Sequence, residues 1–121
     1  MLKRNLPVNG ARVLIMGLTF KENCPDLRNT RVIDIIDKLC DLHANVDVYD
    51  PWVDKDEALR EYDFMPIDEP EPGKYDAIIL AVPHRQFIAM GVGQIRCYGK
   101  PDHVLFDVKY MFPAEATDGR L

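Results

Sequence analysis

The sequence has few of the features that mark disulfide-rich, metal-binding or membrane-spanning proteins. Its three cysteines, Cys24, Cys40 and Cys97, are far apart and form no C-x-x-C pair. This spacing predicts neither a disulfide framework nor a metal site, and it fits a reducing cytoplasm. No apolar run approaches the roughly 18 residues of a membrane-spanning helix. The first ten residues lack the apolar stretch of a signal peptide, so we expect a cytoplasmic protein without a membrane partner.

Basic residues are also in the minority. The chain has 15 lysines and arginines against 20 aspartates and glutamates, which gives a formal charge of −5. Domains that bind DNA or RNA are usually basic, so we expect no nucleic-acid partner. The acidic residues are spread along the chain and do not form a tail, which is typical of charge that serves solubility.

The length and the apolar pattern predict one α/β domain over residues 1–121. Nearly continuous apolar runs at 11–18, 46–49, 77–82 and 104–108 are typical of strands buried on both faces of a parallel sheet. Helical patterns alternate with these runs, which favours βαβ units. The predicted architecture is a three-layer domain of Rossmann or flavodoxin type with a mostly parallel sheet.

The helices are less sharply defined by the sequence. An apolar stripe starting at Val32 predicts a helix of roughly 12 residues, which ends near Ala44-Asn45 because asparagine tolerates the left-handed conformation. A short helix from Asp54 to Glu61, capped by Asp54, and another near 86–90 are expected. The glycines at 91, 93 and 99 predict a loosely structured connection.

Ligands of open parallel sheets bind beyond the carboxyl ends of the strands. The first such loop lacks the glycines of a dinucleotide site, because Thr19 and Glu22 stand where the pattern needs glycine after Gly17. Asp50 lies well beyond the roughly 20-residue spacing of a ribose-binding acid. We therefore interpret Asp50 as a turn former ahead of Pro51.

The first loop carries two cations, Lys21 and Arg28, just before a helix N-terminus. They are either solvated charges neutralised by Glu22 and Asp26, or part of a site where loop amides and cations converge on a phosphate. The residues alone leave both interpretations open.

Histidines and cysteines offer weaker signals. His84 follows a predicted strand, where a structural hydrogen-bond donor or helix-start residue is favoured over a general base, since no acid is evidently tied to it. Cys24 lies in the cationic loop and is interpreted as a small loop residue.

At residues 17–30, GLTFKENCPDLRNT, the sequence resembles the C-terminal, UDP-binding domain of the UDP-glucose/GDP-mannose dehydrogenase family. That family shows a strand ending in glycine, then Phe-Lys, then an acid, a spacer and arginine, then serine or threonine. The matching residues are Gly17, Phe20, Lys21, Asp26, Arg28 and Thr30. The segments 46–54, 81–87 and 106–109, and the final DGRL, resemble the family's later motifs in the same order.

The resemblance implies an NAD-dependent oxidoreductase that converts the C6 alcohol of a UDP-sugar to a carboxylate. This chain would be its sugar-nucleotide-closing domain, and an N-terminal domain would bind NAD and hold the catalytic cysteine. By motif match, Phe20, Lys21 and Lys109 would contact the UDP-sugar, and Arg28 would reach NAD. The resemblance places no catalytic residue in this chain, so we expect the chain alone to be inactive. It also implies a homodimer or larger assembly of the whole enzyme.

The pair Asp107-x-Lys109 and the segment NCPDLRNT look more like the UDP-N-acetylhexosamine branch, which feeds capsule, Vi-antigen and O-antigen synthesis. The alternatives are a UDP-glucose 6-dehydrogenase domain or a non-catalytic Rossmann-like nucleotide-binding regulator. That regulator would need a glycine-rich first loop. A phosphoacceptor receiver would need an acidic pair after the first strand, where LTFK places a cation instead.

Overall fold

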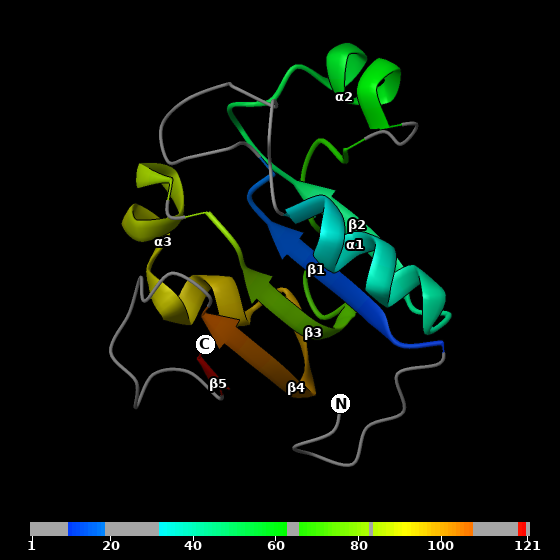
Figure 1. Cartoon of the computed structure of the whole chain (residues 1–121). Helices are drawn as coiled ribbons and strands as arrows, with labels where there is room; N and C mark the ends of the chain where they lie inside the picture. Colours follow the sequence, from blue (N-terminus) through cyan, green and yellow to red (C-terminus); the bar gives the residue numbers. More distant parts are fainter. Residues whose placement is uncertain (1–9, 19–31, 63–65, 83, 108–118, 121) are drawn as a thin grey trace.

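The computed structural model describes residues 10–18, 32–62, 66–82, 84–107 and 119–120 (Figure 1). Its centre is a parallel sheet with the strand order β2-β1-β3-β4-β5. The strand bounds are β1 (Arg12–Met16), β2 (Asn45–Tyr49), β3 (Tyr75–Leu80), β4 (Gly99–Asp107) and β5 (Gly119–Arg120). This is the flavodoxin-type order of doubly wound sheets, and it confirms the predicted three-layer α/β architecture.

Helices cover both faces of the sheet because side chains alternate along each buried strand. The helices are α1 (Val32–Asp41), α2 (Lys55–Tyr62) and α3 (Arg85–Arg96). Val13 and Ile15 of β1 belong to the apolar cluster that includes α1, whereas Leu14 and Met16 belong to the cluster that includes α3. Both faces of β1 are therefore buried, which explains why the apolar residues of this strand follow one another without interruption.

The end of α1 differs from the prediction. The helix has ten residues, and His43, not Asn45, takes the left-handed conformation with φ 63°. The amide of Ala44 donates to the carbonyl of Leu39 at 3.0 Å, and the amide of His43 donates to that of Cys40 at 2.9 Å. These two bonds form a Schellman motif, whose geometry selects the position and overrides residue preference. Asn45 instead begins β2.

The second helix begins as predicted. Asp54 Oδ1 accepts the amides of Asp56 at 2.9 Å and Glu57 at 3.3 Å, which confirms Asp54 as the cap.

The region after β3 is more regular than predicted. The expected loose connection is wrong, because α3 continues through a kink at Gly91 as far as Arg96. The fourth strand begins at Gly99, earlier than predicted, and the short β5 was not predicted. In the part of the chain that the structure describes, no helix has the length and apolar character needed to cross a bilayer.

Candidate functional site

The segments that leave β1, β2 and β3 meet at one end of the sheet. We call this end the carboxyl edge and define it as residues 17–18, 50–52, 82 and 84–87. The chain runs from β1 outward to β2 and then returns across β1 to β3. The connections therefore diverge between β1 and β3, and this switch point is where doubly wound sheets bind ligands.

Gly17 brings the ends of β1 and β3 into direct backbone contact. A Cβ atom at this position would lie 2.6 Å from Val82 Cβ and 2.7 Å from Val82 N, and φ is 108°. The amide of Ala81 also donates to the carbonyl of Met16 at 3.0 Å. Only glycine fits this combination of positive φ and close approach.

One carboxylate joins all three segments of the carboxyl edge. Asp50 Oδ2 accepts the amide of Leu18 at 2.7 Å and lies 2.8 Å from His84 Nε2. Its Oδ1 accepts the amide of Trp52 at 2.7 Å. The side chains of Asp50 and His84 are both fully buried. Asp50 thus holds residues from the ends of three different strands.

The charge of Asp50 follows from its partners. Burial by itself would raise the pKa of Asp50, but the hydrogen bonds from His84, Leu18 and Trp52 outweigh burial, and the pKa lies below its usual range. The carboxyl group is therefore ionised at neutral pH. Because an ionised carboxylate only accepts hydrogen bonds, Nε2 of His84 is protonated and donates a hydrogen bond to Oδ2 of Asp50.

Aromatic and polar contacts reinforce the junction between the loops after β2 and β3. The His84 ring meets Phe87 edge-on at a centroid distance of 5.5 Å. Trp52 Nε1 donates to Gln86 Oε1 at 2.9 Å, and the guanidinium of Arg85 lies 5.1 Å from the centre of the Trp52 ring. The two loops are therefore interlocked through side chains as well as through Asp50.

These contacts confirm two sequence interpretations and correct one assumption. Asp50 forms the predicted turn through its bond to Trp52, and His84 is a hydrogen-bond donor, as the structural interpretation proposed. An acid is nevertheless tied to His84, which the sequence reasoning missed. Both residues follow predicted parallel strands, whose carboxyl ends lie at the same edge of the sheet. Their position at that edge was the signal from which the pairing could have been predicted.

Four predicted binding residues, Phe20, Lys21, Arg28 and Lys109, lie outside the described residues. Their roles stay predictions. Leu18, whose amide is bound by Asp50, precedes the segment that carries three of them.

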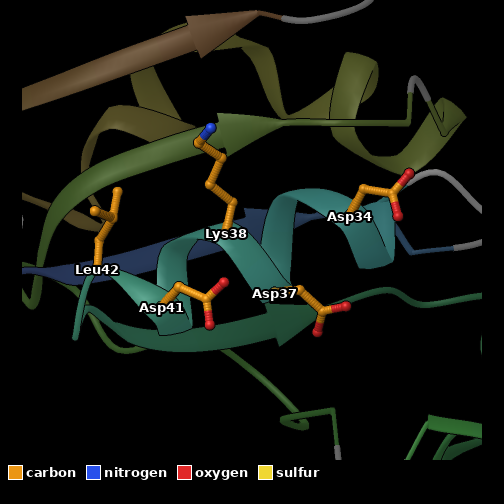
Figure 2. Close-up of a pocket in the computed structure, with 5 residues that line it drawn as sticks. All are labelled: Asp34, Asp37, Lys38, Asp41 and Leu42. Carbon is orange, nitrogen blue, oxygen red and sulfur yellow. The ribbon is translucent and has the colours of Figure 1, made fainter.

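Two surface hollows lie away from the carboxyl edge. Figure 2 shows the hollow on the outer face of α1, lined by Asp34, Asp37, Lys38, Asp41 and Leu42. Asp37 and Asp41 point to one side of the helix, and Lys38 points to the other. The second hollow lies between the end of α3 and the turn before β3 and is lined by Glu69, Pro70, Glu71, Pro72, Gln94, Cys97 and Tyr98. Carboxylates outnumber cations in both, which is unfavourable for phosphate.

Within the described ranges, no three histidine, cysteine or carboxylate side chains lie close enough together to hold a metal ion.

The sheet order and the junction at its carboxyl edge define the class as a doubly wound α/β domain, a class whose ligands bind at the switch point of the sheet. The model of the UDP-glucose/GDP-mannose dehydrogenase family, UDP binding domain, matches residues 14–114. The chain belongs to this family.

Curated relatives match the chain over most or all of its length. It is 54% identical over 121 residues to the UDP-N-acetyl-D-glucosamine 6-dehydrogenase of Pseudomonas aeruginosa, covering 100% of this chain and 29% of the relative. The corresponding enzyme of Salmonella typhi is 53% identical, with 100% and 28% covered. Protein CapL of Staphylococcus aureus is 43% identical over 109 residues, with 90% and 26% covered. The chain thus spans less than a third of these relatives.

Solved structures confirm the fold. An NDP-N-acetyl-D-galactosaminuronic acid dehydrogenase from Methanosarcina mazei superposes with a TM-score of 0.81 at 20% identity, covering 95% of this chain and 24% of that one. A UDP-D-ManNAc dehydrogenase from Pyrococcus horikoshii superposes with a TM-score of 0.76 at 21% identity, covering 98% and 27%. At such identities the likeness concerns the fold alone.

Proposed function

We propose that the chain is the UDP-sugar-binding domain of a cytoplasmic, NAD-dependent dehydrogenase that oxidises the C6 alcohol of a UDP-N-acetylhexosamine to a uronic acid. The observation that carries this proposal is the 54% identity along all 121 residues to a UDP-N-acetyl-D-glucosamine 6-dehydrogenase. We extend the proposal to surface polysaccharide synthesis because the segment NCPDLRNT and the pair Asp107-x-Lys109 resemble the branch that feeds such synthesis. NAD and the catalytic groups would be held by an N-terminal domain of a longer polypeptide, which assembles as a homodimer or larger.

The site we propose for the UDP-sugar is the carboxyl edge. Lys21 stands three residues after Leu18, and Lys109 stands two residues after Asp107, the last residue of β4. Both lysines therefore follow the carboxyl ends of strands in one parallel sheet, where a diphosphate would meet two ammonium groups. Phe20 joins them as a substrate contact in this proposal.

We assign Arg28 to NAD binding. It stands four residues before Val32 in the sequence, where α1 begins. A guanidinium suits a dinucleotide phosphate because it binds oxygen pairs in a fork geometry.

Titrating UDP into the chain by calorimetry tests the binding proposal. A hydrogen bond to a charged group contributes about 1.5–3 kcal/mol, so Lys21→Ala should weaken UDP binding by about tenfold to a hundredfold. Lys38→Ala is the matched control, because Lys38 is an exposed lysine on the outer face of α1 (Figure 2). Equal affinities for the two variants would rule out Lys21 as a phosphate contact.

Steady-state kinetics of the complete dehydrogenase test the reaction. UDP-N-acetylglucosamine should be oxidised with a higher kcat/KM than UDP-glucose, and a reversed preference would favour the UDP-glucose branch. Arg28→Ala should raise the KM for NAD+ and leave the KM for the UDP-sugar nearly unchanged. The 121-residue chain alone should form no NADH from either substrate.

A further inference from the structure

We infer that Asp50 is a positioning residue for nucleotide binding: its buried carboxylate sets where the chain leaves β1 at the carboxyl edge, and thereby sets the affinity for UDP. The inference rests on the proposed function, since it concerns the edge to which the UDP-sugar is assigned. Asp50 acts through other residues, because its side chain is fully buried and reaches no ligand itself.

The geometry couples two loops through one oxygen atom. Oδ2 of Asp50 accepts the Leu18 amide and the His84 ring N–H at 2.7 and 2.8 Å. These partners are 32 and 34 residues away from Asp50 along the chain, on opposite sides of it. A displacement of Oδ2 would therefore displace the start of the first loop relative to the loop after β3.

The surroundings leave this oxygen little freedom to move. The Trp52 amide donates to Oδ1 of Asp50, and the Trp52 indole donates to Gln86. The backbone of Gly17 lies so close to Val82 that a side chain at Gly17 would clash. The exit of the chain from β1 is thus fixed at Gly17 by packing and at Leu18 by a charged acceptor. Binding groups must be held within about 0.5 Å of their productive geometry by the residues that support them, so a shift of these contacts should lower affinity.

A second carboxylate provides a matched control at the opposite end of β1. Asp76 Oδ2 accepts the amide of Arg12 at 2.9 Å, and its Oδ1 pairs with Lys100 Nζ at 3.1 Å. Asp76 therefore does at the start of β1 what Asp50 does just beyond its end. It lies far from the carboxyl edge, so its loss should leave nucleotide binding intact.

The experiment compares Asp50→Asn with Asp76→Asn in the 121-residue chain, with UDP as the titrant. Affinity is measured by calorimetry at a temperature where circular dichroism shows every variant to be folded. Asparagine keeps the shape but replaces one acceptor oxygen with a donor, so it cannot accept all three bonds made by Asp50. Asp50→Asn should weaken UDP binding by about tenfold or more, and Asp76→Asn by less than about twofold.

A second pair, Asp50→Glu and Asp76→Glu, applies if Asp50→Asn does not fold. Glutamate keeps the charge but moves the carboxylate by one methylene, so only Asp50→Glu should weaken UDP binding. In the complete dehydrogenase the same variant should raise the KM for the UDP-sugar more than it lowers kcat.

The outcomes separate the two proposals. A wild-type chain that does not bind UDP overturns the proposed function and this inference together. A wild-type chain that binds UDP, with equal affinities for the Asp50 and Asp76 variants, overturns the positioning role alone.

Discussion

At the carboxyl edge, Asp50 binds the amide of Leu18. At the opposite end of the sheet, which we call the amino edge and define as residues 10–12, 43–47, 74–76 and 100, Asp76 binds the amide of Arg12. The two carboxylates hold the two ends of β1 with the same chemistry in different surroundings. The Asp50 side chain is fully buried, whereas that of Asp76 is 21% exposed and its partner Lys100 is 44% exposed. Water can replace the partners of Asp76, but it cannot reach Leu18 and His84, the two buried partners of Asp50, without a rearrangement.

The amino edge repeats this wetter arrangement. Tyr75 Oη donates to Asp47 Oδ2 at 2.7 Å, and Lys74 Nζ lies 3.7 Å from the same oxygen, with the Asp47 side chain 30% exposed. In each of these contacts the carboxylate is partly exposed to solvent. The comparison teaches that the amino edge contributes stability in small separable steps, whereas Asp50, Leu18 and His84 form one dry unit at the carboxyl edge.

The largest effect should come from a side chain at Gly17. Gly17→Val would place Cβ within 3 Å of Val82 and force a branched residue to φ 108°, so we expect a loss of at least about 4 kcal/mol in the free energy of unfolding. Gly10, on the amino side of β1, has φ 80°, but a Cβ atom added there would have no neighbour within 4 Å. Gly10→Ala should therefore cost only about 1–2 kcal/mol. Urea unfolding measures the free energy of unfolding of both variants. Equal losses would contradict the proposed difference between the two edges of the sheet.

Removing each carboxylate should show the next largest difference. Asp50→Ala removes the ionised acceptor that Asp50 provides to two buried donors, His84 and the Leu18 amide, which should cost about 3–5 kcal/mol. Asp76→Ala should cost about 1 kcal/mol or less, because its partners are reached by solvent. Thermal and urea unfolding measure the stability of both variants. A larger loss of stability in Asp76→Ala would contradict the conclusion that the buried contacts of Asp50 contribute more than those of Asp76.

The pH dependence sharpens this result. The folded pKa of Asp50 lies below its usual value, so its stabilisation is present above the unfolded pKa of about 3.9 and is lost as pH falls through the folded pKa. Asp50→Asn should therefore flatten the fall in stability below about pH 4.

A smaller effect is expected from Tyr75→Phe at the amino edge. The variant loses one hydrogen bond to Asp47, which water can replace, so it should cost about 1 kcal/mol. Burial and then Asp47 raise the pKa of Tyr75. The stabilisation is therefore present below the unfolded pKa of about 10 and is lost as pH rises toward the folded pKa. Unfolding measured above about pH 10 should show a weaker alkaline loss in the phenylalanine variant.

The smallest effect should be a gain. His43 holds a left-handed conformation at the end of α1, and glycine would relieve that strain at some cost in chain entropy. His43→Gly should raise stability by about 0.5 kcal/mol, and UDP affinity should not change because the position lies at the amino edge. His43→Ala serves as the control, and a gain there would show that strain is not the cause.

The sequence by itself determined the features that depend on neighbouring residues. The apolar runs at 11–18 and 77–82 became β1 and β3 because strands buried on both faces need continuous apolar side chains. Asp54 caps α2 because a short side chain reaches amides two and three residues away. The motif between Gly17 and Thr30 indicated the family that the comparison confirmed.

Only the tertiary structure decided which distant groups meet. Asp50 and His84 are 34 residues apart, and they pair because β1 lies between β2 and β3 in the sheet, with both flanking loops turned toward it. Neither residue's local sequence specifies that order. His43 at the end of α1 and the passage of α3 through Gly91 were likewise decided by backbone geometry and packing. Local preferences of about 1 kcal/mol were too small to prevail over burial of whole helix faces against the sheet.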